Sequence, residues 1–233
     1  MTWLPHGSVA IVIGAHGGIG GALCKEIAGR YSGVRLIPLG RSTAPLLDLT
    51  DEASIAAAAA HSARQGDIRL VLDATGYLHD SRHQPEKTWR SLTAEGLARA
   101  FALNAIGPAL LMKHVLPLLP RQGKAAFATL SARVGSIGDN QLGGWYGYRA
   151  SKAALNQLVR TAAVELRRRH PEALCVSLHP GTVATGLSAP FAKAGLDVQT
   201  PKEAAARLLA VIEGLEAAQS GGFFDQNGLE IPW

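Results

Sequence analysis

The stretch VAIVIGAHGGIGG, residues 9–21, decides the fold of this chain. Its first five residues are apolar and end at a glycine, which predicts a buried strand over residues 9–13. Residues 22–30 then carry Leu23 and Ile27 on one helical face, so a helix is expected after the glycine-rich turn. Glycines at such a turn let the backbone approach a pyrophosphate, which the free N–H groups of the helix would bind. The order of strand, glycine-rich turn and helix predicts a dinucleotide-binding turn. Its expected cofactor contacts are Gly14, His16, Gly17, Gly18, Ile19 and Gly20. The alternative is a purely structural turn.

Outward from this turn, apolar strands and helices alternate along the chain. Further strands are predicted at residues 34–39, 46–47, 68–73, 125–130, 174–178 and 222–224, and further helices at 51–65, 93–119, 146–169 and 201–217. The strands are continuous apolar runs, which is typical of a parallel sheet covered by helices on both faces. We therefore predict an α/β, Rossmann-type, doubly wound sheet of seven parallel strands in a single domain, residues 1–233. Residues 186–197 are expected to form a short substrate lid or, alternatively, a surface helix.

Length and composition exclude several classes of protein. The 233 residues carry a net charge of +5, 47% are hydrophobic and two are cysteines, so neither a disordered chain nor a disulfide framework is expected. The sequence has no signal-peptide pattern and no uncharged apolar run long enough to span a membrane. The expectation is a soluble, cytoplasmic protein without a membrane partner.

Two other groups of residues are assigned ordinary roles. The basic run at residues 167–170 ends a helical pattern, where cations complement the helix dipole, so no nucleic-acid partner is expected. His79 and His83 are four residues apart but have no third ligand nearby in the sequence, so no metal is expected.

The end of the second predicted strand bears on the identity of the dinucleotide. Chains that prefer NAD usually have an acidic residue there, which hydrogen-bonds the ribose 2′-hydroxyl. This chain has Gly40, Arg41 and Ser42 instead. A guanidinium pairs bidentately with phosphate, so Arg41, assisted by Ser42, predicts NADP(H) as the preferred cofactor, with NAD(H) as the alternative. An exposed arginine without a ligand is the simpler interpretation.

Tyr148 and Lys152 open the helix predicted after residues 125–130. Positions four apart lie on one helix face, so the ammonium of Lys152 is expected beside the phenol of Tyr148. A nearby positive charge favours the phenolate and lowers the pKa of a tyrosine from its usual value near 10. The pair is therefore a candidate acid and base at neutral pH. Taken alone, a solvated pair at this spacing is the default interpretation.

Together these motifs resemble the short-chain dehydrogenase/reductase family over essentially the whole chain. The glycine spacing in residues 14–20 is similar to the family's cofactor loop, and Tyr148 and Lys152 are similar to its active-site pair. Four further segments match the family, and they follow one another in the family's order. Asp48 and Leu49 are similar to the pair that contacts adenine, Asn104 to the asparagine of the long central helix, and Ser131 to the catalytic serine. The family's P-G-x-V-x-T segment is matched by Pro180, Gly181, Val183 and Thr185.

A closer resemblance is to the C-factor-like branch of the family, through residues 135–146 and 223–233. The family's N-N-A-G motif appears here as Asp73-Ala74-Thr75-Gly76, in which Asp73 is expected to brace the sheet and the other three to meet the cofactor. Ser131 precedes Tyr148 by seventeen residues (148 − 131), which predicts a lengthened loop beside the active site. Gly17 stands where many NADP-preferring members have a basic residue.

The resemblance implies an NADP(H)-dependent oxidoreductase that interconverts a carbonyl and an alcohol. Tyr148 would transfer the proton, Lys152 would lower its pKa and bind the nicotinamide ribose, and Ser131 would hydrogen-bond the substrate oxygen. Asn104 would hold a water in a proton relay, and Thr185 would fix the carboxamide. The implied partners are a small-molecule substrate and further copies of the chain, in a homodimer or homotetramer. The alternatives are a dinucleotide-binding regulatory or signalling protein with little turnover and, more remotely, a nucleic-acid-binding protein.

Overall fold

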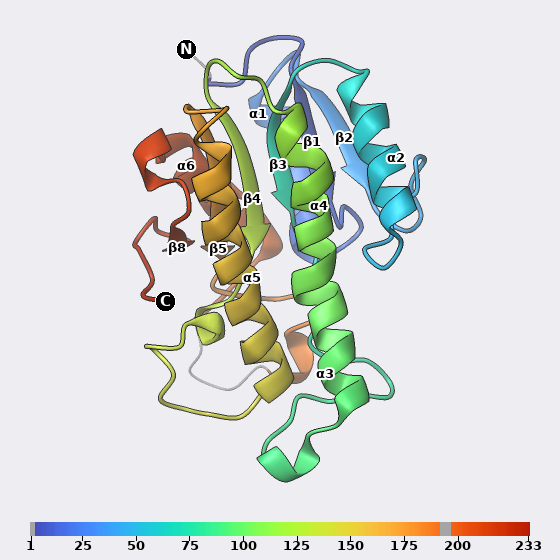
Figure 1. Ribbon diagram of the computed structural model, residues 1–233, viewed down its shortest axis with the longest axis vertical. Coiled ribbons are helices and arrows are strands. Elements are labelled where there is room, and N and C mark those ends of the chain that lie inside the picture. Colours follow the sequence, from blue (N-terminus) through green and yellow to red (C-terminus); the bar gives the residue numbers. More distant parts are fainter. Residues whose placement is uncertain (1–2, 192–196) are drawn as a thin grey trace.

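The computed structural model describes residues 3–191 and 197–233, which fold around a parallel sheet (Figure 1). Within these residues the main sheet has six strands in the order β2-β1-β3-β4-β5-β8, and all of its pairings are parallel. β2 lies on one side of β1, and β3, β4 and β5 follow on the other side, so the strand order reverses at β1. This is the doubly wound sheet predicted from the sequence. The bounds of the strands are Val9–Ile13 (β1), Arg35–Leu39 (β2), Ile68–Asp73 (β3), Ala125–Leu130 (β4), Ala173–His179 (β5) and Phe223–Asp225 (β8).

Helices cover both faces of the sheet. Neighbouring residues of β1 point to opposite faces, as strand geometry requires, and each face has its own apolar core. One core joins the sheet to α2 (Glu52–Ala63), α4 (Gly107–Val115) and α5 (Tyr146–Leu166). The other joins it to α1 (Gly18–Arg30) and α6 (Pro201–Gly214). Figure 1 shows α4 and α5 side by side over one face.

The predicted strand at residues 46–47 does not form, which is why the main sheet has six strands in the described residues instead of seven. Leu46 makes only an isolated bridge with Gly40. Thr43 Oγ1 accepts a hydrogen bond from Gly40 N at 2.9 Å and donates to Pro45 O at 2.7 Å. These local bonds fold the segment into a turn, so it does not pair with β2. Two short strands that the sequence did not indicate, β6 (Thr182–Val183) and β7 (Val198–Gln199), form a separate parallel ladder.

The long central helix changes its winding in the middle. α3 (Ala94–Phe101) continues through a π-helical turn, Ala102–Ile106, into α4, and a 3₁₀ turn follows at Leu116–Leu118. The span from 94 to 118 is long and apolar enough to cross a membrane by length and composition, whereas no membrane-spanning run was expected from the sequence. In the fold, one side of α4 is buried in the core against the sheet, as expected of a core helix.

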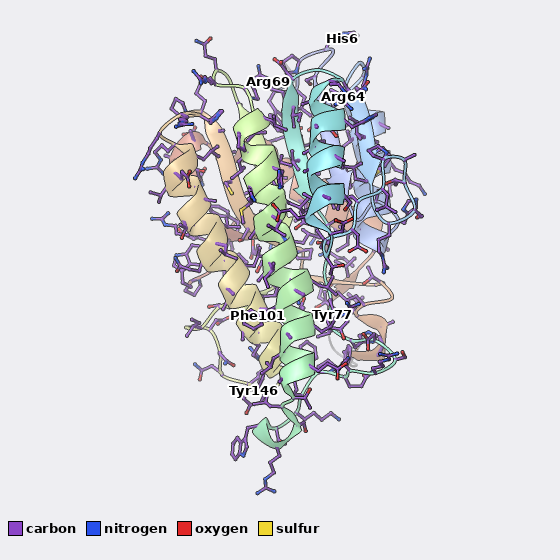
Figure 2. All side chains as sticks on the ribbon, turned by 45° about the vertical axis from the view of Figure 1, so that its right-hand side comes forward. His6, Arg64, Arg69, Tyr77, Phe101 and Tyr146 are labelled. Carbon is purple, nitrogen blue, oxygen red and sulfur yellow. The ribbon has the colours of Figure 1, made fainter. Side chains whose placement is uncertain are left out.

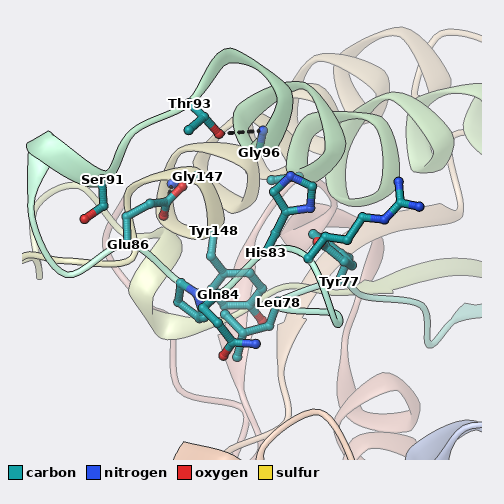
Figure 3. Close-up of a pocket in the computed structure, with 13 residues that line it drawn as sticks. Tyr77, Leu78, His83, Gln84, Glu86, Ser91, Thr93, Gly96, Gly147 and Tyr148 are labelled. Carbon is teal, nitrogen blue, oxygen red and sulfur yellow. Dashed lines mark hydrogen bonds between the residues drawn. The ribbon is translucent and has the colours of Figure 1, made fainter.

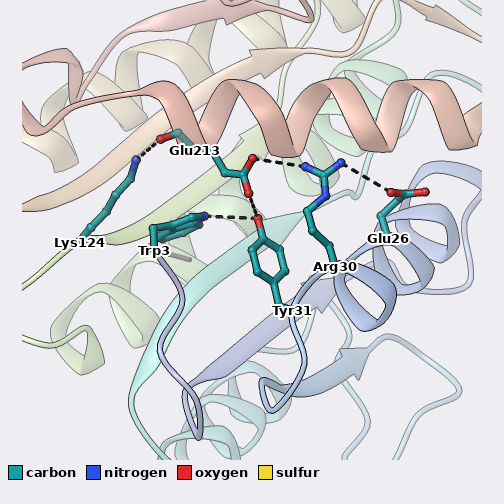
Figure 4. A network of polar contacts seen from close by, with 6 residues as sticks. All are labelled: Trp3, Glu26, Arg30, Tyr31, Lys124 and Glu213. Carbon is teal, nitrogen blue, oxygen red and sulfur yellow. Dashed lines mark hydrogen bonds and ion pairs between the residues drawn. The ribbon is translucent and has the colours of Figure 1, made fainter. Parts of the chain in front are cut away.

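Polar side chains tie α1 to α6 at the amino-terminal edge of the sheet (Figure 4). The Tyr31 hydroxyl donates to the carboxylate of Glu213, which also pairs with Arg30 at 3.3 Å. Trp3 Nε1 donates to the same hydroxyl at 3.4 Å. Lys124 Nζ donates to Glu213 O at 2.7 Å and lies 5.1 Å from the centroid of the Trp3 ring. In this network each charged or hydroxyl group has a partner.

Loops after the strands gather at the opposite edge. Figure 2 places Arg64 and Arg69 at the end where β3 begins, and Tyr77 and Tyr146 toward the end where β3 has finished and α5 starts. Because the strands are parallel, the loops that follow β1, β3, β4 and β5 reach this carboxyl edge together. Doubly wound sheets bind their ligands there.

Candidate active site

A cavity of about 370 Å³ lies at the carboxyl edge of the sheet. It brings together predicted site residues that are far apart in the sequence: Ile19, Ser131, Tyr148, Pro180, Gly181, Val183 and Thr185. Much of the remaining wall is apolar, and it is made by Leu78, Val134, Leu142, Trp145, Leu187 and Phe191. The cavity therefore combines a few polar groups with a mainly apolar wall, which is typical of small-molecule sites.

The glycines of the turn lie where the chain is closely packed, so side chains there would collide with neighbouring segments. Gly14 has a φ of 78°, and a Cβ there would lie 3.1 Å from the backbone of Ala74. A Cβ on Gly18 would lie 2.8 Å from Cγ2 of Thr185. α1 begins at Gly18, and no side chain caps its first N–H groups. The uncapped N–H donors at the start of α1 fit a pyrophosphate.

Ser131 follows β4 directly, and its hydroxyl is unpaired. Its N–H donates to Leu178 O at 2.8 Å, which fixes the backbone beside β5. Its Oγ is buried and has no hydrogen-bond partner in the part of the chain that the structure describes. An unpaired buried hydroxyl costs about 1–3 kcal/mol, so it is expected to find its partner in a ligand.

Lys152 is buried one turn along α5 from Tyr148. Its Nζ donates to Leu130 O at 2.7 Å and lies 5.9 Å from the centroid of the Tyr148 ring. Burial lowers the pKa of Lys152 to about 8, and the negative charge of Asp73 opposes that shift. The amine is therefore mostly protonated at pH 7. A Cβ on Gly76 would lie 3.9 Å from Nζ, so the loop after β3 also reaches this amine.

The pKa of Tyr148 departs from the sequence-based expectation. Burial raises it to about 12, and the predicted lowering by Lys152 does not appear. The reason is geometric, because the ammonium lies over the phenol ring and hydrogen-bonds Leu130 O. Tyr148 is therefore a neutral phenol at physiological pH, which makes it a proton donor in this state.

Asn104 lies in the π-helical turn, and its amide is fully engaged. Its Oδ1 accepts from Tyr77 N and its Nδ2 donates to Tyr77 O, both at 2.7 Å. Nδ2 also donates to Ser151 Oγ at 3.0 Å. The side chain thus connects the loop after β3 to α5, and π-helical turns often occur at functional sites. The water-relay role of Asn104 stays a prediction.

Asp73 braces the ends of β3 and β4, as expected from the altered motif. Its Oδ2 accepts from Thr129 Oγ1 at 2.7 Å, and its Oδ1 accepts from Thr75 N at 3.1 Å. The carboxylate thereby fixes the loop that places residues 74 and 76 against the glycine turn and Lys152.

Residues predicted at the 2′ position of the ribose lie beyond β2. Ser42 Oγ is 3.3 Å from His16 Nδ1, which connects this segment to the glycine turn. Arg41 is exposed and makes no hydrogen bond or ion pair within residues 3–191 and 197–233. Its guanidinium is therefore available to an anion.

The predicted adenine-contacting pair comes next. Asp48 Oδ1 accepts from the backbone and hydroxyl of Thr50, at 2.8 and 2.7 Å. These bonds lower the pKa of Asp48, with a smaller contribution from the charge of Arg41. Leu49 is buried, and a Cβ on Gly107 would lie 2.7 Å from its Cβ.

The segment after β5 is held by its own side chains. Ser188 Oγ lies 3.2 Å from Thr185 Oγ1 and donates to Val183 O. This arrangement fixes Thr185 against Gly18 of the turn. Of the lid predicted at 186–197, the structure gives a 3₁₀ turn at Ala189–Phe191, and residues 192–196 lie outside the described part.

Trp145 lines the cavity but was not predicted as a site residue from the sequence. It precedes α5 with a φ of 51°, a left-handed conformation that costs a bulky residue about 1–3 kcal/mol. Its ring lies 6.2 Å from that of Tyr148 and 5.2 Å from that of Phe191. Glu86 holds the strained backbone, since its carbonyl accepts from Trp145 N at 2.5 Å and its carboxylate from Gly147 N at 3.1 Å (Figure 3). The two glycines before this tryptophan were the available signal.

The two histidines four residues apart do not converge on one site. His79 Nε2 lies 3.2 Å from Leu187 O, whereas His83 Nδ1 lies 3.5 Å from the carboxylate of Asp80. Within the described residues, no three His, Cys, Asp or Glu side chains are grouped to hold a metal. His83 lines a smaller cavity of about 150 Å³ that also has Tyr148 in its wall (Figure 3).

Comparisons with known proteins identify the family. Residues 35–218 match the family model described as enoyl-(acyl carrier protein) reductase. The chain is 41% identical over 139 residues to C-signal of Myxococcus xanthus, covering 59% of this chain and 78% of that protein. It is 32% identical over 235 residues to 1-hydroxy-2-glutathionyl-2-methyl-3-butene dehydrogenase of Rhodococcus sp. (strain AD45), covering 97% and 100%.

A solved structure gives the same result. NADPH-bound carbonyl reductase from chicken fatty liver is similar to this chain with a TM-score of 0.85 and 27% identity, covering 99% of this chain and 100% of that one. With the match to the family model and the full-length relative, the fold and the site lead to one assignment. This chain belongs to the short-chain dehydrogenase/reductase family, near its C-factor-like branch.

Proposed function

We propose that the protein is an NADP(H)-dependent oxidoreductase that interconverts a carbonyl and an alcohol. The observation that carries this proposal is the cavity in which an unpaired serine hydroxyl, Ser131, and a phenol, Tyr148, meet the glycine turn. A dehydrogenase and a carbonyl reductase among the similar proteins support it.

The chemistry divides between the cofactor and the chain. The dinucleotide would be held along residues 14–20, where the turn fits a pyrophosphate, and it supplies the hydride when bound. Ser131 donates a hydrogen bond to the carbonyl oxygen, on which negative charge develops. Tyr148 gives that oxygen its proton. The ammonium of Lys152 then stabilises the phenolate that remains.

At neutral pH Tyr148 and Lys152 are in the protonation states that proton donation to a carbonyl oxygen needs. A Tyr148 pKa of about 12 keeps the phenol loaded with its proton at pH 7. A Lys152 pKa of about 8 keeps most of the amine positive at that pH. Reduction of a carbonyl can begin with the proton already on Tyr148 and the positive charge already on Lys152. Oxidation of an alcohol would first need the Tyr148 phenolate.

The preference for NADP(H) rests on Arg41. Its exposed guanidinium has no partner in the described residues, and no acidic residue stands directly after β2. A 2′-phosphate would accept a bidentate pair from Arg41 and a further bond from Ser42. The NADPH-bound carbonyl reductase supports this assignment by similarity.

We also propose that the chain forms a homodimer or homotetramer through α4 and α5. Ile106, the residue directly before α4, is 54% exposed, and Val164 on α5 is 52% exposed. The two helices lie side by side and present one continuous face (Figure 1). Light scattering of the wild type and of V164E tests this, with a monomeric wild type as the contradicting result.

Turnover is tested by following NADPH oxidation with a panel of ketones and aldehydes. We expect consumption of NADPH by the wild type, a rate below detection for Tyr148→Phe, and a larger loss with NADPH than with NADH for Arg41→Ala. Tight cofactor binding without turnover on any carbonyl would favour the regulatory or signalling alternative instead.

A further inference from the structure

His179 is a polar residue of the cavity wall to which the proposed mechanism gives no role. It ends β5, where Leu130 of β4 pairs with Leu178, so Ser131 and His179 occupy the next positions in the same register. Paired positions on neighbouring strands point their side chains to the same face and lie about 4.8 Å apart. Both residues line the cavity of about 370 Å³.

These two side chains share a property that separates them from the rest of the wall. Within residues 3–191 and 197–233, several buried side-chain atoms have no hydrogen-bond partner, and of these only Ser131 Oγ and His179 Nδ1 belong to residues that line this cavity. Buried polar atoms are nearly always paired, so two unpaired atoms on residues of one cavity wall indicate that a ligand completes this part of the wall.

The imidazole offers hydrogen bonds without charge. Burial lowers the pKa of His179 to about 4, and the positive charge of Arg133 adds to this, while Asp225 opposes it. At neutral pH the ring is therefore uncharged, with one nitrogen as a donor and the other as an acceptor. It suits a hydroxyl or a second carbonyl oxygen.

The charged residues of the cavity wall are already paired with each other or with the backbone. Arg133 forms ion pairs with Asp139 at 3.3 Å and with Asp225 at 3.8 Å. Arg149 donates to the carbonyls of Gly143 and Gly144, at 3.0 and 2.9 Å. A carboxylate or phosphate on the substrate would find no free cation among these residues.

We propose that His179 is a substrate-binding residue, which hydrogen-bonds an uncharged oxygen on the carbon next to the carbonyl held by Ser131. A substrate with oxygens on two adjacent carbons could place one oxygen at Ser131 and the other at His179, since these residues lie on neighbouring strands. The substrate class is then α-hydroxy ketones and α-dicarbonyls with an apolar substituent, which Trp145 and Phe191 would contact. This inference rests on the proposed function and names the substrates of the same site.

The test compares two alcohols that differ by one hydroxyl, 1-phenyl-1,2-ethanediol and 1-phenylethanol. Their affinities are measured by calorimetry with and without NADPH. With the reduced cofactor neither alcohol can react, so no turnover is needed. We expect the wild type to prefer the diol, and His179→Leu to lose about 10- to 100-fold of that preference, as for one buried hydrogen bond.

Two further variants separate this role from a structural one. His179→Asn keeps an uncharged donor and acceptor and is expected to restore part of the preference. Ser177→Ala is the matched control, since Ser177 Oγ on the same strand is also buried and unpaired but does not line the cavity. It should leave the preference unchanged.

The results that would overturn the proposal are distinct from failure of the proposed function. Equal preference in the wild type and His179→Leu, equal weakening of both alcohols, or no binding of either alcohol to the wild type would each exclude a substrate contact by His179. Reduction of 2-hydroxyacetophenone and acetophenone is measured in parallel. If both alcohols bind as expected but neither ketone is reduced, the contact stands and the oxidoreductase assignment fails.

Discussion

Tyr31 and Tyr148 allow the two edges of the sheet to be compared. In both, burial is the main cause of a pKa raised to about 12. Tyr31, at the amino edge, also donates to the carboxylate of Glu213 and accepts from Trp3. Tyr148, at the carboxyl edge, lines a cavity, and its hydroxyl makes no hydrogen bond among the described residues. The pKa is therefore raised equally in both tyrosines, but the Tyr31 hydroxyl is already hydrogen-bonded within the chain, whereas the Tyr148 hydroxyl is free to donate its proton to a ligand.

Two lysines differ in the same way, of which Lys124 is half-buried and Lys152 is buried. Burial lowers the pKa of Lys124, while Glu213 and Glu216 oppose that shift, and its amine donates to two carbonyl oxygens. Lys152 has one carbonyl partner, Leu130 O. At the amino edge these polar groups find their hydrogen-bond partners within the chain, whereas at the carboxyl edge some hydrogen-bonding groups remain for a ligand. This contrast locates the site more sharply than burial or charge alone.

The largest expected effect is on catalysis. Tyr148→Phe should lower kcat by about 10²- to 10⁴-fold, because the proton donor is lost. Its free energy of unfolding should stay within about 0.5 kcal/mol of the wild type, since the hydroxyl has no partner to lose. Steady-state kinetics and urea unfolding measure the two quantities. A folded variant with unchanged kcat would remove Tyr148 from the mechanism.

A smaller effect concerns acid stability. The pKa of His179 is about 4 in the folded chain and near 6.5 when exposed. Between these values the unfolded chain binds a proton that the folded chain does not, so the free energy of unfolding rises with pH and is constant above that window. Lowering the pH from 7 to 5 should cost about 2 kcal/mol through this residue.

His179→Gln isolates that contribution, because glutamine does not titrate. Urea unfolding at pH 7 and pH 5 should show a smaller loss of unfolding free energy for the variant than for the wild type. Identical losses would mean that His179 is protonated in the folded state at pH 5, contrary to its burial.

The smallest expected effect is on the amino edge. Tyr31→Phe removes one hydrogen bond to Glu213 and should lower the free energy of unfolding by about 1 kcal/mol. Turnover should not change, because the network lies at the opposite edge from the cavity. The two variants are expected to have opposite effects: Tyr31→Phe lowers stability without changing kcat, and Tyr148→Phe lowers kcat without changing stability. Equal effects of both variants on kcat would remove the distinction between the two edges.

Much of this arrangement was predictable from local sequence. The strand, glycine turn and helix of residues 9–30 follow from apolar runs and glycine positions, and the spacing of Tyr148 and Lys152 follows from helix geometry. The strand predicted at 46–47 failed because Thr43 closes a local turn whose hydrogen bonds compete with pairing to β2.

Other features depend on contacts between distant segments. The left-handed backbone of Trp145 is sustained by Glu86, about sixty residues earlier in the chain. The pKa of Tyr148 depends on how deeply the phenol is buried and on where Lys152 directs its proton, neither of which spacing reveals. The role of His179 emerges only when its register beside Ser131 is known.

The most direct test of the central claim is a fluorescence titration of NADPH into the wild type, Tyr148→Phe and Gly18→Val. A side chain at Gly18 would collide with Thr185 and displace the turn, since even a Cβ there lies 2.8 Å from Cγ2 of that threonine. We predict binding to the wild type and Tyr148→Phe with similar affinity, and loss of binding to a folded Gly18→Val. Absence of binding to the wild type, or equal binding to all three, would contradict a dinucleotide site at the carboxyl edge.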